Sequence, residues 1–263
     1  MKRRAIFLDR DGTLVHPVHY PSCPEQLRLY DHIGSELYGL QQMGFRLIVV
    51  TNQSGIARGY FSEADLQQMH QHLARELAAS DVYLSGIYYC PHHIDGIIPE
   101  LAIQCACRKP EPGMLLRAAA ELDLDLHRSW LVGDILDDIE AGNRAGCRTM
   151  LVDLGTEELP SQMKRCPTFV ARDSCHALRM IQTIESLGSA LELTYRPENW
   201  RYALSAPYAV RTCHNEAGSD SASATGSASS PMSGLALAQS QIAQSGADCS
   251  GEYVMEEDSC RIL

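Results

Sequence analysis

The stretch FLDRDGTLV, residues Phe7–Val15, begins with apolar side chains and then places two carboxylates, Asp9 and Asp11, directly after them. The apolar run within Arg4–Leu8 predicts a buried strand, and Gly12 allows a tight turn behind it. Burying unpaired carboxylates costs free energy, so this pair needs a cation, hydrogen-bond donors or water beside it. A D-x-D-G sequence taken alone is more often a polar turn, so the rest of the chain has to decide.

Strands and helices alternate along the chain after this segment. Further strands are predicted at residues 45–50, 83–89, 129–132 and 149–152, and helices at 34–43, 63–79, 112–122 and 137–145. A segment at 167–170 and a helix near 176–186 complete the domain. Ser62 and Asp65 have the spacing of a capping box for the second helix. The alternation predicts an α/β fold with a Rossmann-like, doubly wound parallel sheet covered on both faces.

Three polar clusters follow predicted strands, at residues 9–13, 51–55 and 133–138. Because ligands of such sheets bind beyond the carboxyl ends of the strands, we expect the three clusters to converge on one rim. In the second cluster, the hydroxyl and backbone N–H of Thr51 are suited to hold a phosphoryl oxygen, and Asn52 is suited to orient Asp9 or the substrate.

The side chains on this rim are those that phosphoryl transfer requires. A carboxylate such as Asp9 can attack phosphorus, and Asp11 can protonate the leaving oxygen and then deprotonate water. Arg108 and Lys109 offer cationic clamps for a phosphate. Asp134 and Asp9 supply the oxygen ligands that Mg²⁺ prefers. Each segment has an ordinary explanation by itself, but the four together in this order indicate a catalytic site.

In these four segments the chain resembles the haloacid dehalogenase (HAD) superfamily of phosphohydrolases, through DRDGT, Thr51, Lys109 and the GDxxxD motif that contains Asp134 and Asp138. The resemblance implies that Asp9 is the nucleophile and Asp11 the general acid and base. It implies that Thr51 and Lys109 bind the phosphate. It also implies a Mg²⁺ ion held by Asp9, the carbonyl of Asp11, and Asp134.

A second constellation lies between the third strand and the following helix, where YYCPHH is followed by CACRKP. Cys90, His92, Cys105 and Cys107 are three thiolates and one imidazole, the composition of a closed, structural zinc site. Zinc would tie down an irregular loop next to Arg108 and Lys109. The alternative is chance clustering of reduced cysteines. His93 fits the family resemblance less well than His92.

The combination of DRDGT, VVTNQSGIARGYFSE, GIYYCPHH, CxCRKPEPGML and VGDxxxDI resembles the D-glycero-D-manno-heptose 1,7-bisphosphate 7-phosphatase family, with histidinol-phosphate phosphatases as relatives, over about residues 4–185. The resemblance implies hydrolysis of the C7 phosphate in the synthesis of nucleotide-activated (ADP- or GDP-) heptose for the lipopolysaccharide core. It implies substrate contacts from Asn52, Gln53, Ser54, Gly55, Arg58 and Arg108. Ile135 stands where the family has a lysine, which leaves turnover rate and anomer preference open.

Two alternatives remain at this point. A histidinol-phosphate phosphatase would favour acids near the entrance for the cationic amine, whereas Arg58 and Arg108 favour a substrate with a second phosphate. A non-catalytic, zinc-stabilised binding module is the other, and it is motivated by Ile135 and by the unusual C-terminal segment. The intact acids and Lys109 argue against it.

The composition limits the partners. The chain has 263 residues, a formal charge of -11 and a pI near 5.3, which disfavours nucleic acid and anionic membranes as partners. The N-terminus has no apolar core of signal-peptide length, and no stretch approaches about 18 consecutive apolar residues. We therefore expect a cytoplasmic protein, and the absence of a strong apolar repeat favours a monomer that acts on a small phosphorylated sugar.

The C-terminal part differs in composition from the rest. Residues 205–263 contain 12 serines and few large apolar side chains, which predicts that they cannot bury enough surface to fold. The expected division is a phosphatase domain without a large cap domain over residues 1–190 and a largely disordered extension over residues 191–263.

Overall fold

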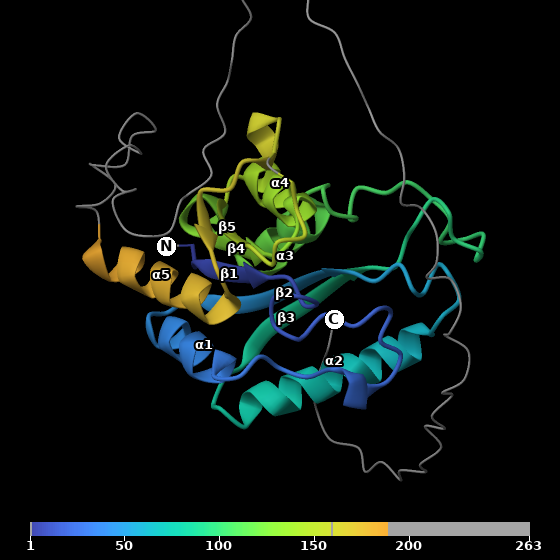
Figure 1. Ribbon diagram of the computed structural model, residues 1–263, viewed down its shortest axis with the longest axis horizontal. Helices are drawn as coiled ribbons and strands as arrows, with labels where there is room; N and C mark the ends of the chain where they lie inside the picture. The colour runs from blue at the N-terminus through green and yellow to red at the C-terminus, as the bar shows by residue number, and fades with distance from the viewer. Residues whose placement is uncertain (1, 159, 189–263) are drawn as a thin grey trace, which may run out of the picture. The chain divides into compact units, whose positions relative to one another are not determined.

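The computed structural model describes residues 2–158 and 160–188 of the chain (Figure 1). Six parallel strands form one sheet in the order β3-β2-β1-β4-β5-β6. Their bounds are Ala5–Leu8 (β1), Arg46–Asn52 (β2), Leu84–Cys90 (β3), Trp130–Gly133 (β4), Arg148–Val152 (β5) and Phe169–Ala171 (β6). The predicted doubly wound parallel sheet is confirmed. The predicted disorder of residues 191–263, and the domain boundary at residue 190, lie outside the described residues.

Helices cover both faces of this sheet (Figure 1). The helices on one face are α1 (Ile33–Gln42), α2 (Glu63–Ala78) and α5 (Ser174–Leu187), and those on the other are α3 (Gly113–Leu122) and α4 (Leu136–Ala145). Short 3-10 turns lie at Pro24–Gln26, Leu126–Arg128 and Met163–Arg165. Strand side chains alternate between the faces: Ile6 and Leu8 pack with α1, α2 and α5, while Phe7 packs with α3 and α4.

Helix α2 begins where the capping sequence predicts. The N–H of Asp65 donates to the hydroxyl of Ser62 at 3.2 Å, and the N–H of Ser62 donates to the Asp65 carboxylate at 2.8 Å. Such a reciprocal cap stabilises a helix by about 0.5–2 kcal/mol. The cap fixes the end of the polar loop that runs from Thr51 to the helix.

The reversal of strand order between β1 and β4 opens a crevice at the carboxyl edge of the sheet. The N–H of Asp9 donates to the carbonyl of Val132 at 2.9 Å, so the first carboxylate sits at this crevice. The segment between β3 and α3, residues 91–112, contains no helix or strand and, as predicted, no large cap domain. Within residues 2–158 and 160–188, no helix is both long and apolar enough to cross a membrane.

Candidate active site

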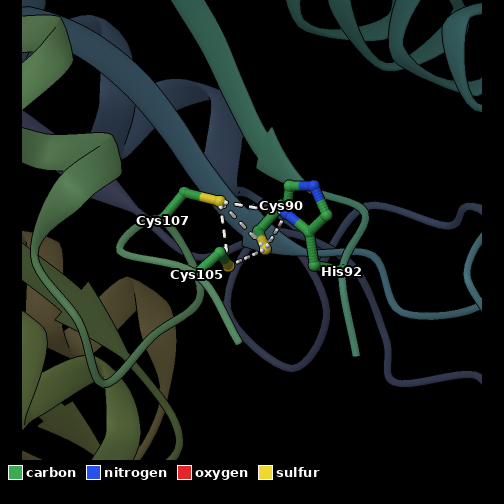
Figure 2. Close-up of side chains that lie close together, drawn as sticks. All are labelled: Cys90, His92, Cys105 and Cys107. Carbon is green, nitrogen blue, oxygen red and sulfur yellow. Dashed lines mark hydrogen bonds between the residues drawn. The ribbon is translucent and has the colours of Figure 1, made fainter. Parts of the chain in front are cut away.

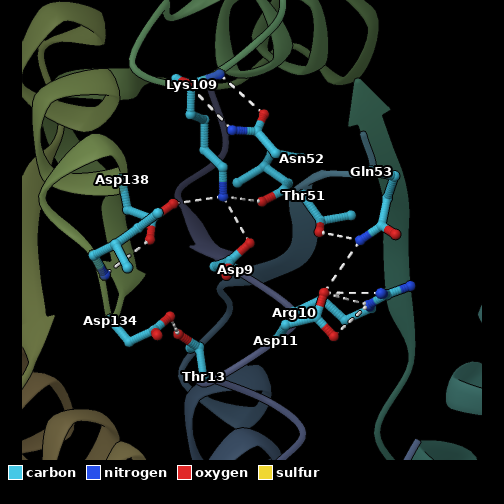
Figure 3. A network of polar contacts seen from close by, with 12 residues as sticks. Asp9, Arg10, Asp11, Thr13, Thr51, Asn52, Gln53, Lys109, Asp134 and Asp138 are labelled. Atoms are coloured by element: carbon cyan, nitrogen blue, oxygen red, sulfur yellow. Dashed lines mark hydrogen bonds and ion pairs between the residues drawn. The ribbon is translucent and has the colours of Figure 1, made fainter. Parts of the chain in front are cut away.

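A buried lysine joins two carboxylates at the centre of the site (Figure 3). The ammonium of Lys109 donates to Asp9 Oδ1 at 2.6 Å and to the carbonyl of Val50 at 2.8 Å, and it lies 2.5 Å from Asp138 Oδ1. Lys109 is only 2% exposed. The second carboxylate oxygen of Asp138 accepts the N–H of Ile135 at 3.3 Å, which ties the start of α4 to the same network. One oxygen of Asp9 is thus held by the lysine, and the other is available for chemistry.

Burial controls the protonation of these groups. Desolvation alone would lower the pKa of Lys109, but the carboxylates of Asp138 and Asp9 outweigh it, so its pKa lies above its ordinary value. Desolvation raises the pKa of Asp9 to about 8, because Lys109 offsets only part of the effect while the carboxylates of Asp138, Asp134 and Asp11 add to it. The lysine is therefore a permanent cation, whereas ionisation of Asp9 is disfavoured without a further positive charge.

Asp134 lies on the other side of Asp9, at the end of β4. Its carboxylate packs against the backbone of Gly12, where an added Cβ would lie 2.2 Å from Asp134 Oδ2. The hydroxyl of Thr13 donates to Asp134 Oδ1 at 3.3 Å. Desolvation, followed by the Asp138 carboxylate, raises the pKa of Asp134 to about 7.

This donor set fits a divalent cation. Carboxylate oxygens of Asp9, Asp134 and Asp138 all lie within 4.8 Å of one another. Both oxygens of Asp138 are engaged, one by Lys109 and one by the N–H of Ile135, which leaves Asp134 and the second oxygen of Asp9 as the carboxylate ligands. Mg²⁺ is commonly bound through one or two carboxylates plus substrate phosphate, and a nearby cation favours the ionised acids.

Asp11 points away from Asp9, toward an arginine and a glutamine (Figure 3). The guanidinium of Arg10 donates to both Asp11 oxygens at 2.8–3.2 Å, and Gln53 Nε2 donates to Asp11 Oδ2 at 3.2 Å. Gln53 Nε2 also donates to the hydroxyl oxygen of Thr51 at 2.8 Å. Arg10 is completely buried, while Asp11 is partly exposed. The general acid expected from the sequence is thus oriented from two sides.

Asn52 clamps the backbone of the lysine. Its Nδ2 donates to the carbonyl of Lys109 at 3.1 Å, and its Oδ1 accepts the N–H of Lys109 at 3.0 Å. A paired contact of this kind fixes both position and orientation, so the last residue of β2 places a lysine 57 positions further along the chain.

The remaining predicted substrate residues lie along the loop after β2 and beside the segment after β3. Gly55 packs under the ring of Phe61, and Ser54 is partly exposed in the same turn. Arg58 Nη2 lies 3.1–3.2 Å from the ring nitrogens of His93. Arg108 Nη1 donates to the carbonyl of His92 at 3.3 Å. Desolvation and then the charges of Arg108 and Arg58 lower the pKa of His93.

The four predicted zinc ligands converge (Figure 2). The sulfur atoms of Cys90, Cys105 and Cys107 lie 3.2–3.5 Å apart, and His92 Nδ1 lies 3.3 Å and 3.6 Å from two of them. Tetrahedral Zn²⁺ with bonds of about 2.3 Å to sulfur and about 2.0 Å to nitrogen requires separations of about 3.5–3.8 Å. The donor atoms are therefore near the spacing of a closed zinc site, and His93 lies with Arg58 instead.

Known proteins resemble this chain in sequence. The sequence profile of the HAD-hydrolase-like family matches residues 106–177. A curated relative from Pasteurella multocida (strain Pm70), named D-glycero-beta-D-manno-heptose-1,7-bisphosphate 7-phosphatase, is 42% identical over 185 residues, which are 70% of this chain and 100% of the relative. The chain belongs to this heptose bisphosphate phosphatase family. A family member of the same name from Haemophilus influenzae is 48% identical over 139 residues, 53% of this chain and 75% of the relative.

Two solved structures agree with the fold. The D,D-heptose 1,7-bisphosphate phosphatase from B. bronchiseptica, complexed with magnesium and phosphate, superposes with a TM-score of 0.59 at 31% identity, over 69% of this chain and 99% of that one. A HAD-like phosphatase from Mesorhizobium loti gives a TM-score of 0.63 at 38% identity, over 71% of this chain and 88% of that one.

Three residues of the site were not in the predicted set. Arg10 holds Asp11, Asp138 holds Lys109, and Thr13 holds Asp134. Arg10 continues the two-residue alternation of β1, which was a usable signal. Asp138 was part of the motif that carries the heptose bisphosphate phosphatase resemblance, but the sequence did not show that it pairs with the lysine. Ile135, the predicted departure from the family, lies at the N-terminus of α4 with a partly exposed side chain.

Proposed function

We propose that the protein is a Mg²⁺-dependent phosphatase that removes the C7 phosphate of D-glycero-β-D-manno-heptose 1,7-bisphosphate. The observation that carries the proposal is the Asp9–Lys109 pair at 2.6 Å, with Asp134 beside it and Asp11 two residues along the chain. The relatives are named for this reaction and for the β anomer, which supplies the choice of sugar.

The chemistry follows from the free oxygen of Asp9. This oxygen attacks phosphorus and forms an aspartyl-phosphate, while the bond between phosphorus and the sugar oxygen breaks. Asp11 transfers its proton to the departing sugar oxygen. Asp11 then takes a proton from water, the water oxygen attacks phosphorus, and inorganic phosphate leaves as the Asp9 carboxylate is restored.

The surrounding groups act by position and charge. Lys109 keeps one Asp9 oxygen in place and faces the transferring phosphoryl group, as Thr51 does from the end of β2. Asp9, Asp134 and the carbonyl of Asp11 would hold Mg²⁺, which would supply positive charge that offsets the repulsion between the carboxylate and the phosphate. Arg10 and Gln53 orient the Asp11 carboxylate through their hydrogen bonds to it.

The substrate carries a second phosphate, which is not transferred and needs its own binding residues. We assign its binding to Arg58 and Arg108, which contact the neighbouring residues His93 and His92 in the segment after β3. Two guanidinium groups suit a phosphate dianion and disfavour a cationic amine. This favours a bisphosphate over histidinol phosphate. Ser54 and Gly55 lie with Arg58 in the loop after β2 and complete the proposed substrate contacts.

The zinc site has a structural role in this proposal. Zn²⁺ held by Cys90, His92, Cys105 and Cys107 would fix the segment that carries Arg108 and Lys109. All four donors come from the protein, so no coordination position is left for substrate.

Phosphate release from the heptose bisphosphate, fructose 1,6-bisphosphate and histidinol phosphate tests the proposal, with and without Mg²⁺. We expect activity that depends on Mg²⁺ and is highest for the heptose substrate. Asp9→Asn should abolish it, whereas Asp123→Asn, at an exposed position, should not. If neither the wild type nor Asp9→Asn releases phosphate from any of these substrates, the result would support a non-catalytic binding module instead.

The assembly state and location of the enzyme are proposals from the sequence. We propose a cytoplasmic monomer, on the composition and the absence of a strong apolar repeat. Light scattering after size exclusion measures the mass, for which 29.0 kDa is expected. Cell fractionation measures the location.

A further inference from the structure

Most cationic side chains of the described residues have an acceptor. The arginines and lysines with an acceptor pair with carboxylates or with neighbouring polar groups. Within residues 2–158 and 160–188, the side chains without such an acceptor are Lys2, Arg3, Arg28, Arg46, Arg75 and Arg128. Four of these six line a single cavity, which is unexpected in a chain with a net charge of -11.

This cavity lies at the end of the sheet opposite the candidate active site. Lys2 and Arg3 precede β1, Arg46 begins β2, and Arg128 precedes β4, whereas Asp9 follows β1 at its other end. The volume is about 470 Å³. The lining residues are Lys2, Arg3, Arg4, Gln41, Gly44, Phe45, Arg46 and Arg128, none of which is acidic. The phosphatase chemistry proposed above uses none of them.

The floor of the cavity is fixed. The guanidinium of Arg4 lies 4.2 Å from the centre of the Phe45 ring, pairs with Glu185 at 2.7 Å and donates to the carbonyl of Met43 at 3.0 Å. The backbone of Arg3 exchanges hydrogen bonds with Asp123 and Asp125 at 3.0 Å and 2.8 Å. Arg4 is thus a structural member, and the exposed cations around it are free to meet a ligand.

A second cavity of about 420 Å³ adjoins the first and shares Arg3, Gln41, Phe45 and Arg46 with it. Its other lining residues are Tyr83, Leu84, Ser85 and Leu122. The Tyr83 side chain is 63% exposed, and its N–H donates to Gln41 Oε1 at 2.8 Å, which anchors its backbone beside the shared wall. One cavity is therefore cationic, and its neighbour offers an aromatic ring and apolar carbon.

The volumes of the two cavities indicate the size of the ligand. Small-molecule sites have volumes of about 300–1,000 Å³, a range that contains both cavities. A membrane surface or a long nucleic acid would bring many negative charges close to a chain whose net charge is -11, and this charge would repel it. A ligand with several phosphates joined to a flat ring system fits this pair of cavities, because the phosphates suit the cationic cavity and the ring suits the cavity that contains Tyr83.

We propose that the paired cavities bind a nucleoside di- or triphosphate, with its phosphates between Lys2, Arg46 and Arg128 and its base against Tyr83. Cations without competing carboxylates hold phosphate oxygens through charge-assisted hydrogen bonds. Nucleobases stack on exposed aromatic rings. The site is separate from the phosphatase site, so binding there does not depend on the function proposed above.

Isothermal titration of the full chain tests the site, with ATP, tripolyphosphate and adenosine as probes. The Asp9→Asn protein is used in buffer without added magnesium, to suppress turnover and binding at the catalytic rim. We expect ATP to bind, tripolyphosphate to bind about tenfold more weakly, and adenosine to give no measurable heat. Affinity for ATP should fall as ionic strength rises.

Substitutions locate the binding. Arg46→Gln with Arg128→Gln should weaken ATP binding about 30-fold or more, whereas Arg28→Gln with Arg75→Gln, the same charge change at exposed positions outside both cavities, should leave it within twofold. Tyr83→Ser should reduce the preference for ATP over tripolyphosphate. The proposal is overturned if ATP fails to bind, if both double variants behave alike, or if Tyr83→Ser leaves the preference unchanged. Tighter binding to anionic phospholipid vesicles than to ATP would likewise overturn it.

Discussion

One buried histidine should lose its contribution to stability in acid. His70 lies on the buried face of α2, is 5% exposed, and has no hydrogen-bond partner for Nε2 among the described residues. Desolvation and then the charge of Arg10 lower its pKa to about 3. In the unfolded chain the imidazole has its ordinary pKa of 6.5. The folded protein therefore keeps this ring neutral at pH values where the unfolded chain takes up a proton.

The sign and size of the effect follow from proton linkage. Because the folded pKa is depressed, the stability is fully present above pH 6.5 and is lost as pH falls through the window down to about 3. Between pH 7 and pH 5, His70 alone should reduce the free energy of unfolding by about 2 kcal/mol. Asp9 and Asp134 act in the opposite direction, since a raised carboxyl pKa makes acidification favour the folded state.

Urea unfolding of wild type and His70→Leu at several pH values between 7 and 5 isolates the histidine. The difference between the two proteins should change by about 2 kcal/mol over this range, because contributions from the acids are common to both and cancel. His72→Leu, two residues along the same helix at a partly exposed position, is the matched control and should leave the difference flat. Parallel curves for wild type and His70→Leu would refute the reasoning.

Further predictions concern the site and the metal centres. Lys109→Met leaves two buried carboxylates without their cation, so unfolding should become easier by about 3–5 kcal/mol and phosphate release should disappear; thermal denaturation and the phosphate assay measure both. Gly12→Ala brings a methyl group 2.2 Å from Asp134 Oδ2 at a φ of +79°, and titration should show Mg²⁺ affinity reduced at least tenfold. Gly44→Ala is its control, since φ is +86° but nothing lies within 4 Å of the new methyl group, and Mg²⁺ affinity should be unchanged. Removing zinc with a chelator, or substituting Cys105→Ser, should lower the melting temperature, and an unchanged melting temperature would contradict a structural zinc.

Local sequence patterns predicted most of the fold, because the residues that determine each strand or helix lie within that segment of the chain. Apolar runs such as Ile6–Leu8 bury as strands, and the Ser62 cap sets the start of α2 within the sequence itself. The edge of the sheet where polar clusters meet also follows from parallel strands, since every carboxyl end points the same way. The exact ends of elements depend on packing, which is why the strand predicted to end at Val50 continues to Asn52.

The contacts that place the site were harder to predict, because they join distant segments. Lys109 and Asp9 are 100 residues apart, and the clamp from Asn52 to the lysine backbone has no local signature. Arg10 is different, because it is in phase with Ile6 and Leu8. The alternation of β1 therefore directs it toward the face that α1, α2 and α5 cover. A charged side chain at such a position is informative, since it remains buried only with a partner, here the Asp11 carboxylate.

The charges of the site explain why these residues occur together. Arg10 and Asp11 neutralise each other at the edge, whereas the centre sets three carboxylates, Asp9, Asp134 and Asp138, against the one ammonium of Lys109. When all four groups are ionised, three negative charges and one positive charge leave a deficit of two. Protonation can relieve it, as the raised pKa values of Asp9 and Asp134 indicate, and so can one divalent cation. In the proposed mechanism the cation would keep Asp9 ionised and able to attack phosphorus, so metal binding would also activate the nucleophile.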